Sequence, residues 1–357
     1  MILTFSRGWN NIPYFEKTNI QNKQYFTVIV PARNEEKCIG FLLNDLKAQK
    51  YSSDFFEVLM VDDHSNDCTA EIMKNFCKEN INFFYIKSGN NEHGKKTAIK
   101  NAVSKAKGAL IITTDADCRV SNDWISLFGS YYEQYKPKII SGPVAINNTN
   151  NIFSRMQALE FISLVGSGAG AIGAGYPIMC NAANLCFEKE IFLDEVDNTK
   201  SHNYASGDDI LLMLNIKKKY PNDIKFIKAR NSIVYTQPLK SLKEYISQRK
   251  RWTSKSRAYS DIDIIFTAIL VFFINASLLL CFIAMFFSYS FFILFLILFV
   301  SKSFPDFILL KKNCNFFQSR KLLRVFIPLQ LIYPFYITFT AIYGNIGKFI
   351  WKERKLK

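Results

Sequence analysis

Two carboxylates separated by one residue, Asp115 and Asp117, are the side chains best placed to do chemistry. They follow the apolar run 109–112, whose β-branched residues are typical of a buried strand. In open α/β sheets, ligands bind beyond the carboxyl ends of the strands. Hard cations such as Mg²⁺ and Mn²⁺ take oxygen ligands, often one or two carboxylates plus substrate phosphates. The pair therefore indicates a divalent metal site, against the alternative of a solvated turn, where Asp is common.

Other polar clusters also follow predicted strands, namely Asn34-Glu35 after residues 25–30 and Asp62-Asp63 after residues 56–61. Lys95 opens a predicted helix, where backbone N–H groups and the helix dipole already favour phosphate. In a parallel sheet all these groups fall at one edge. Such an edge can hold a base and ribose, a diphosphate and a bridging metal.

The elements that position these residues alternate between strand and helix. Apolar runs predict strands at 25–30, 56–61, 83–86 and 109–112, and helical spacing predicts helices at 39–46, 68–78 and 94–103. The first strand is expected to end at Pro31, because Pro cannot continue a central ladder. This alternation predicts an α/β fold, a doubly wound and mostly parallel sheet. No glycine-rich Walker loop is present, which argues against a P-loop NTPase.

The middle of the chain has a helical pattern over 152–164, followed by the glycine-rich stretch 166–173. This stretch contains a formal Gly-x-Gly-x-x-Gly. Helix, rather than strand, precedes it, so dinucleotide binding is not favoured and a flexible loop is expected.

Further candidates lie in the second half of the chain. Asp208 and Asp209 precede an apolar helix, and helix capping accounts for only one of the two carboxylates. On a helix, Gln248, Arg251 and Trp252 stand at i, i+3 and i+4 and share one face. A basic juxtamembrane helix with an interfacial Trp is the plainer interpretation of this segment. A functional role for the three residues on the shared face is compatible with it.

The charge of the chain points to a membrane. Lys and Arg number 45 against 30 Asp and Glu, a net charge of +15, and the region after residue 261 is both basic and apolar. Basic charge flanking apolar segments indicates anionic lipids rather than nucleic acid, for which no module signature is present. The eight cysteines are scattered and the histidines are few, so we do not expect a zinc site. We expect the cysteines to be reduced thiols in a protein that faces a cytosol. The apolar run at residues 1–7 is too short for a secretory signal.

Three apolar segments lie in this region, at 262–287, 289–310 and about 325–346. The first is long enough to span a bilayer, and in the second Lys302 and Asp306 stand at i, i+4, where they can pair. The positive-inside rule places 249–257 and 311–324 in the cytoplasm. Three full crossings would put the basic tail outside, so either the third segment does not cross or the tail breaks the rule.

Five motifs in order resemble the membrane-bound family-2 glycosyltransferases, which include cellulose, chitin and hyaluronan synthases and ceramide glucosyltransferase. The motifs are residues 28–36 (VIVPARNEE), residues 61–67 (VDDHSND), Asp115-Ala116-Asp117, Gly207-Asp208-Asp209 and Gln248-x-x-Arg251-Trp252. The resemblance covers about residues 25–252. It implies a cytosolic GT-A-like domain followed by C-terminal transmembrane helices, and a nucleotide-diphosphate sugar donor, most often a UDP-sugar.

The resemblance also implies roles for individual residues. The nucleotide-sugar would be bound by residues Arg33, Glu35, Asp62, Asp63 and Lys95, with Asp63 on the base, and the metal, Mg²⁺ or Mn²⁺, by Asp115 and Asp117. Asp209, beside Asp208, matches the general base that deprotonates the acceptor hydroxyl. The acceptor and leaving-group residues would be Asn184, Gln248, Arg251 and Trp252.

Three positions depart from the family pattern. His64 stands where Gly usually follows the paired Asp, Ala182 replaces a Gly, and Asp208 replaces a frequent Glu. The first two departures concern the shapes of the local loops.

We expect four parts along the chain: a lead-in at 1–24, a nucleotide-sugar-binding half at 25–150, an acceptor half at 151–260 and a membrane region at 261–357. The expected activity is inverting sugar transfer to a lipid or saccharide hydroxyl, by a multi-pass cell-membrane protein with a cytoplasmic catalytic domain. The alternatives are a nucleotidyltransferase, which can share paired acids and a metal, and an inactive membrane scaffold.

Overall fold

The computed structural model describes residues 1–17, 24–89, 93–198, 208–254, 259–344, 349–351 and 354–356. The described residues form two compact units that interleave along the sequence. The sheet unit comprises residues 11–147 and 179–237, and the helical unit comprises residues 1–10, 148–178 and 238–357.

The sheet unit is built on seven strands in the order β3-β2-β1-β4-β7-β5-β8. Their bounds are β1 Phe26–Ala32, β2 Phe56–Asp62, β3 Phe83–Lys87, β4 Leu110–Thr113, β5 Ile139–Ser141, β7 Leu185–Glu188 and β8 Ile224–Phe226. The pairs β1–β2, β1–β4 and β2–β3 are parallel, whereas β7 runs antiparallel to both β4 and β5. The predicted doubly wound, mostly parallel sheet is therefore confirmed.

The predicted end of the first strand at Pro31 is wrong. β1 continues to Ala32, which pairs with Asp62 at the end of β2. On its other side β1 pairs with β4 only as far as Ile29. Beyond that point β1 has a single neighbouring strand, so the N–H group that Pro31 lacks does not interrupt a ladder on both sides.

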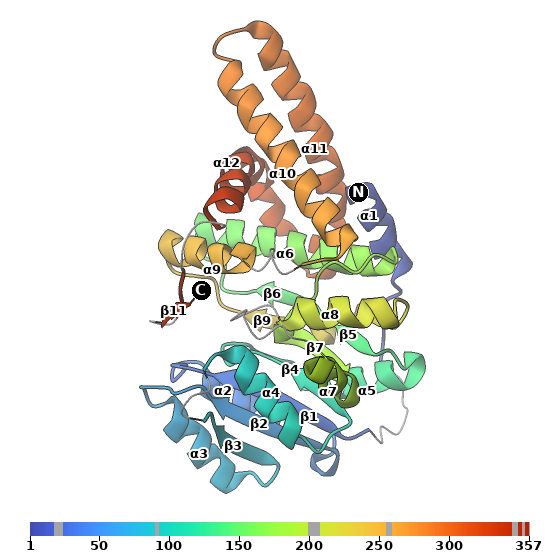
Figure 1. Cartoon of the computed structure of the whole chain (residues 1–357), viewed down its shortest axis with the longest axis vertical. Coiled ribbons are helices and arrows are strands. Elements are labelled where there is room, and N and C mark those ends of the chain that lie inside the picture. The colour runs from blue at the N-terminus through green and yellow to red at the C-terminus, as the bar shows by residue number, and fades with distance from the viewer. Residues whose placement is uncertain are drawn as a thin grey trace. The chain divides into compact units, whose positions relative to one another are not determined.

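Helices pack on the sheet because their apolar faces cover its apolar strands. Those of this unit are α2 Ile39–Lys47, α3 Thr69–Glu79, α4 Lys95–Lys105, α5 Trp124–Tyr135, α7 Lys189–Asn198 and α8 Asp208–Lys219 (Figure 1). Helix α2 packs against α3, and α4 against α7. Every residue of β2 is buried, as expected for a strand covered on both faces. A separate parallel pair joins β6 Val144–Ile146 to β9 Val234–Thr236.

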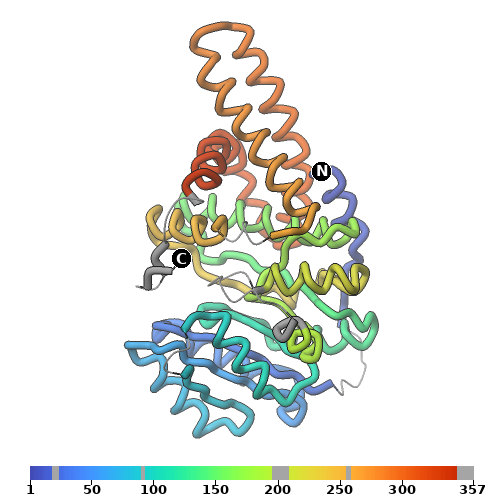
Figure 2. The backbone as a smooth tube through the Cα atoms, viewed as in Figure 1, coloured from blue at the N-terminus to red at the C-terminus, as the bar shows by residue number. Residues whose placement is uncertain are grey.

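The helical unit contains α1 Ile2–Asn11, α6 Ile152–Gly173, α9 Leu242–Ser254, α10 Ile262–Ala284, α11 Tyr289–Phe316 and α12 Phe326–Gly344, and the short hairpin of β10 Phe349–Trp351 and β11 Arg354–Leu356. The tube in Figure 2 follows α10 through a turn into α11 as a long helical hairpin. Among the described residues, three segments are long and apolar enough to cross a membrane: Ile262–Ala284, Tyr289–Phe316 and Arg320–Tyr343. The predicted pairing of Lys302 with Asp306 is confirmed at 3.0 Å.

The expected loop at residues 166–173 is wrong, because α6 continues through all of them. A Cβ atom at Gly166 would overlap the side chain of Asn313 on α11, and one at Gly170 would overlap the backbone of Phe5 on α1. The glycines thus allow close approach of helices, which offsets their poor helix propensity.

Candidate functional site

The first acidic cluster lies at the end of β2. Asp62 is buried, and its two carboxylate oxygens accept hydrogen bonds from the Ser65 N–H group, at 3.0 Å, and the Tyr85 hydroxyl, at 3.3 Å. Burial, and then the charge and hydrogen bond of Asp62, raise the pKa of Tyr85 to about 12. Asp63, also buried, accepts a hydrogen bond of 3.1 Å from the N–H group of Gly94, just before α4.

Arg33 holds the loop that follows β2. Its buried Nη1 atom donates hydrogen bonds to the carbonyl oxygens of Asp63, at 2.8 Å, and His64, at 3.1 Å. Glu35 is half-buried, and its N–H group donates to the hydroxyl of Thr69, at 2.7 Å. The structure thus places both residues at the predicted sheet edge, with Arg33 bonded to the chain's own backbone. Their contact with a nucleotide stays a prediction.

Asp115 and Asp117 follow β4, as predicted. Asp115 forms an ion pair with Lys95 at the start of α4. Asp117 accepts a hydrogen bond of 3.0 Å from the Thr236 hydroxyl at the end of β9. Burial, and then the neighbouring Asp115 carboxylate, raise the pKa of Asp117. Two carboxylates close enough to interact suit a divalent cation, and their oxygen atoms match Mg²⁺ or Mn²⁺.

Asp209 lies in the first turn of α8 and is tied to the segment before β7. Its carboxylate accepts hydrogen bonds from the N–H groups of Ala182, at 3.0 Å, and Ile210, at 2.9 Å. Its carbonyl oxygen accepts one from the Cys180 thiol, at 3.2 Å. The side chain of Asp208 and the whole of Gly207 lie outside the described residues.

Asn184 is fully buried, and both its amide oxygen and its amide nitrogen form hydrogen bonds within the protein. Its oxygen accepts a hydrogen bond of 3.0 Å from the indole of Trp124, and its nitrogen donates to the carbonyls of Pro143, at 2.7 Å, and Ser232, at 2.8 Å. The structure therefore assigns Asn184 a part in packing three segments. Its predicted role toward an acceptor stays a prediction.

Helix α9 of the helical unit carries Gln248, Arg251 and Trp252. The helix predicted for these three residues is therefore present. The guanidinium carbon of Arg249 lies 4.2 Å from the centroid of the Trp252 ring. Arg249 is buried and forms a 2.7 Å ion pair with Glu160 on α6. The pair was missed from sequence because the two residues are 89 positions apart.

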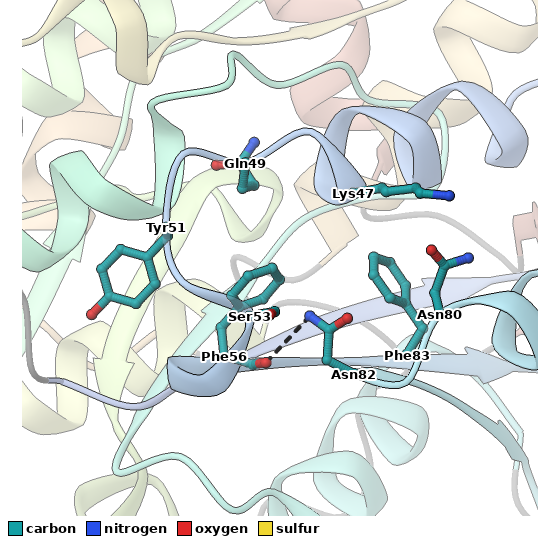
Figure 3. Close-up of a pocket in the computed structure, with 8 residues that line it drawn as sticks. All are labelled: Lys47, Gln49, Tyr51, Ser53, Phe56, Asn80, Asn82 and Phe83. Carbon is teal, nitrogen blue, oxygen red and sulfur yellow. Dashed lines mark hydrogen bonds between the residues drawn. The ribbon is translucent and has the colours of Figure 1, made fainter.

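A small pocket occurs at the opposite edge of the sheet unit. It measures about 230 Å³, and its lining includes Phe56 and Phe83, the first residues of β2 and β3 (Figure 3). The Asn82 amide donates a 3.4 Å hydrogen bond across it to the Phe56 carbonyl. The pocket lies at the amino ends of the strands, whereas the acidic clusters lie at the carboxyl ends. It therefore does not belong to the candidate site.

Known proteins resemble this chain in sequence and in fold. The chain matches the family model described as Glycosyl transferase family 2 over residues 27–186, and that described as Glycosyl transferase family group 2 over residues 110–310. The poly-β-1,6-N-acetyl-D-glucosamine synthase of Staphylococcus aureus (strain COL) is 29% identical over 154 residues, 42% of this chain and 35% of that protein. The 4,4'-diaponeurosporenoate glycosyltransferase of Staphylococcus haemolyticus is 34% identical over 112 residues, 31% of this chain and 29% of that protein. The similarity thus spans about a third of these relatives' length.

Among solved structures, the mannosyltransferase PcManGT from Pyrobaculum calidifontis, in complex with GDP-Man and Mn²⁺, matches with a TM-score of 0.63. The match covers 97% of this chain and 95% of that one, at 16% sequence identity. At this identity the likeness shows a shared fold.

Proposed function

Because the chain belongs to glycosyl transferase family 2, and is therefore a glycosyltransferase, we propose that it moves a sugar from a nucleotide-diphosphate sugar to an acceptor hydroxyl. The family resemblance carried by the sequence motifs is confirmed, as is the GT-A-like fold with C-terminal apolar helices. We propose a UDP-sugar as donor and a lipid or saccharide as acceptor.

The observation that carries the proposal is the start of α4, which joins two acidic clusters from different strands. Gly94 donates its N–H group to Asp63, and the next residue, Lys95, pairs with Asp115. The proposed base contact at Asp63 and the positive charge of Lys95 are therefore neighbours at the start of α4. That sequence of groups supports the binding of a nucleoside diphosphate, with the base at Asp63 and the phosphates toward Lys95.

Asp115 and Asp117 would hold the divalent metal, Mg²⁺ or Mn²⁺. A metal bound there supplies positive charge that stabilises the leaving diphosphate. Lys95 contributes a fixed positive charge beside the same carboxylates.

Asp209 is the proposed general base. A sugar hydroxyl is a poor nucleophile until a carboxylate within hydrogen-bond reach takes its proton. The N–H groups of Ala182 and Ile210 hold the Asp209 carboxylate in place. Direct attack by the acceptor then inverts the anomeric centre. We propose that Trp252 and Gln248 line the acceptor site and that Arg251 steadies the leaving diphosphate.

We further propose that the protein is a multi-pass membrane protein that acts at the cytosolic face. The three long apolar segments support membrane insertion, and the basic residues within 311–324, where the second segment ends and the third begins, support a cytosolic connection.

A release assay with a panel of sugar nucleotides tests the proposal. The panel includes UDP- and GDP-linked donors of N-acetylglucosamine, glucose and mannose, each tried with lipid and saccharide acceptors. We expect acceptor-dependent release of the nucleoside diphosphate. Release of sugar 1-phosphate instead, the group that leaves when the nucleotide itself is transferred from such a donor, would indicate the alternative, a nucleotidyltransferase. The absence of any release across the panel, from a protein that binds no nucleotide, would favour an inactive scaffold.

A further inference from the structure

Two of the chain's three histidines meet beside the buried Asp63. The rings of His64 and His93 have centroids 4.7 Å apart, although 28 residues separate them in the sequence. One potential ligand atom from each of Asp63, His64 and His93 lies within 4.8 Å of the other two. Two imidazoles and a carboxylate form a set that binds Zn²⁺ and related borderline metals, because such ions prefer nitrogen over purely oxygen ligands.

The loop that carries two of these residues is held rigidly. Arg33 donates hydrogen bonds to the carbonyl oxygens of both Asp63 and His64. His64 has a φ of 56°, in the left-handed region where a glycine meets least strain. A side chain other than glycine at such a position is held there by its surroundings, and such positions concentrate at functional sites. The backbone of Asp63 and His64 is therefore held in place by the fold.

The contacts of the His64 and Asp63 side chains match those of metal ligands. The Nε2 atom of His64 lies 3.1 Å from the carbonyl oxygen of Gly89. Histidines that bind metals through one ring nitrogen commonly donate the other N–H group to a backbone carbonyl or a carboxylate, which sets the ring orientation. Asp63 accepts the Gly94 hydrogen bond through Oδ2, and the several lone pairs of a carboxylate allow it to accept hydrogen bonds and ligate a metal at the same time.

We propose that Asp63, His64 and His93 form a binding site for a borderline divalent metal of the Zn²⁺ class, distinct from the oxygen-only pair Asp115 and Asp117. The four-coordinate geometry of such ions leaves one position for water or another ligand. Small side-chain movements bring the three ligand atoms to bonding distance, and His93 is exposed, which gives an ion access from solvent.

The site has a regulatory consequence, and this part alone rests on the proposed function. Asp63 is the residue proposed to contact the base of the donor. A metal held by Asp63, His64 and His93 would occupy the space in which the base is proposed to contact Asp63, so metal and nucleotide compete for this carboxylate. Ions of the Zn²⁺ class therefore inhibit donor binding, whereas Mg²⁺ or Mn²⁺ at the other site supports it.

Cobalt binding tests the site directly. The full-length protein, purified in detergent without a polyhistidine tag and kept in excess Mg²⁺, is titrated with Co²⁺, whose visible absorption reports nitrogen ligands in a four-coordinate site. We expect one equivalent to bind, with the affinity reduced at least about tenfold in His93→Ala and in His64→Gly. Glycine is the replacement at position 64 because it accepts the left-handed backbone.

Matched controls separate this site from others. His202→Ala removes the chain's third histidine, and the Asp115→Asn/Asp117→Asn double variant removes the proposed Mg²⁺ or Mn²⁺ site. Both are expected to bind Co²⁺ as the parent does. Unchanged Co²⁺ affinity in His93→Ala and His64→Gly would overturn the proposed site.

A competition titration tests the consequence. UDP is expected to displace Co²⁺ from the parent protein, and Co²⁺ retained at saturating UDP would overturn the competition. If the parent bound Co²⁺ through the two histidines but bound none of the panel nucleotides, the metal site would stand and the proposed function would fail.

Discussion

Asp209 offers the sharpest test at the scale of single residues. The Asp209→Asn variant keeps one side-chain oxygen, which can still accept the Ala182 N–H group, and loses only the acceptor of the Ile210 N–H group in the first turn of α8. It loses the ability to take a proton, and loss of a general base costs about 10²–10⁴-fold in rate. We expect sugar transfer to fall by that factor while UDP affinity, measured by calorimetry, stays close to that of the parent.

The neighbouring carboxylate provides the control for this experiment. Asp208→Asn removes a charge one position away and is expected to lower transfer less than Asp209→Asn. Transfer by Asp209→Asn within about threefold of the parent rate would show that Asp209 is not the base.

Asn184 gives a prediction about stability. Its replacement by Ala leaves the buried Trp124 indole and the Ser232 carbonyl without this partner, whereas the Pro143 carbonyl keeps its 3.0 Å hydrogen bond from the Val234 N–H group. Each unpaired buried group costs about 1–3 kcal/mol, so we expect Asn184→Ala to lower the free energy of unfolding by at least about 2 kcal/mol. Thermal unfolding followed by intrinsic fluorescence measures the loss.

The matched control is Asn181→Ala, three residues away. Asn181 makes a single capping bond, from the N–H group of Ala183, and its removal costs about 1 kcal/mol. Equal unfolding midpoints for the two variants would contradict the structural role of Asn184.

How much of the site can be predicted from sequence depends on how local each residue's placement is. Asp62, Asp115 and Asp117 can be assigned to the sheet edge because an apolar run predicts the strand that each of them ends or follows. Arg33 and Asn184 differ, because their hydrogen-bond partners lie 30 to 60 residues away. No local pattern indicates that the Arg33 side chain bonds to the loop after β2 or that the Asn184 side chain points into the interior.

At the scale of elements, the same reasoning explains the glycine-rich helix. Low helix propensity predicts a loop at residues 166–173, and propensity is a weak guide where tertiary packing decides. Gly166 and Gly170 of α6 face other helices of the helical unit, where a side chain would not fit. Close helix packing of this kind appears in a sequence only as an excess of small residues, without naming the partner helix.

Gly166 provides the test of that packing. Gly166→Ala forces a methyl group against Asn313 on α11, and overpacking of this kind costs about 1–3 kcal/mol. We expect a lower unfolding midpoint in detergent. Gly40→Ala is the matched control, since Gly40 also lies in a helix but has open space around its Cβ position. Alanine's higher propensity is expected to leave that variant as stable as the parent or more so. A Gly166→Ala midpoint at or above that of Gly40→Ala would contradict the packing.

At the scale of the whole molecule, apolar exposure predicts membrane insertion. Helices α10 and α11 present many large apolar side chains to their surroundings, among them Phe266, Phe273, Ile297 and Val300. Exposed apolar area on this scale is unfavourable in water. We expect the full-length protein to stay in the membrane fraction on washing with alkaline carbonate and to dissolve in detergent. Its release by carbonate alone would contradict insertion.

The interleaving of the two units could not be predicted from the order of segments along the chain. The sequence suggests a catalytic domain that ends near residue 260, followed by a membrane region. In the structure α1, α6 and α9 group with the apolar helices. Trp9 of α1 packs edge-on against Phe316 of α11, with ring centroids 5.4 Å apart, and Lys312 donates a 2.7 Å hydrogen bond to the Ser6 hydroxyl. Contacts across 300 residues leave no periodic signal.

This grouping predicts the outcome of truncation. A chain that ends at Ser254 keeps α6 but loses α11, so the glycine-lined face of α6 loses the helix that covers it. It also loses α12, whose Tyr336 ring lies 5.6 Å from that of Tyr245 on α9. Helices α6 and α9 then expose apolar surface. We therefore expect the truncated protein, expressed beside the full chain, to aggregate in detergent-free buffer and to elute in the void volume on size-exclusion chromatography. A monomeric, detergent-free truncated protein with an undiminished unfolding midpoint would show that α6 and α9 do not depend on the apolar helices.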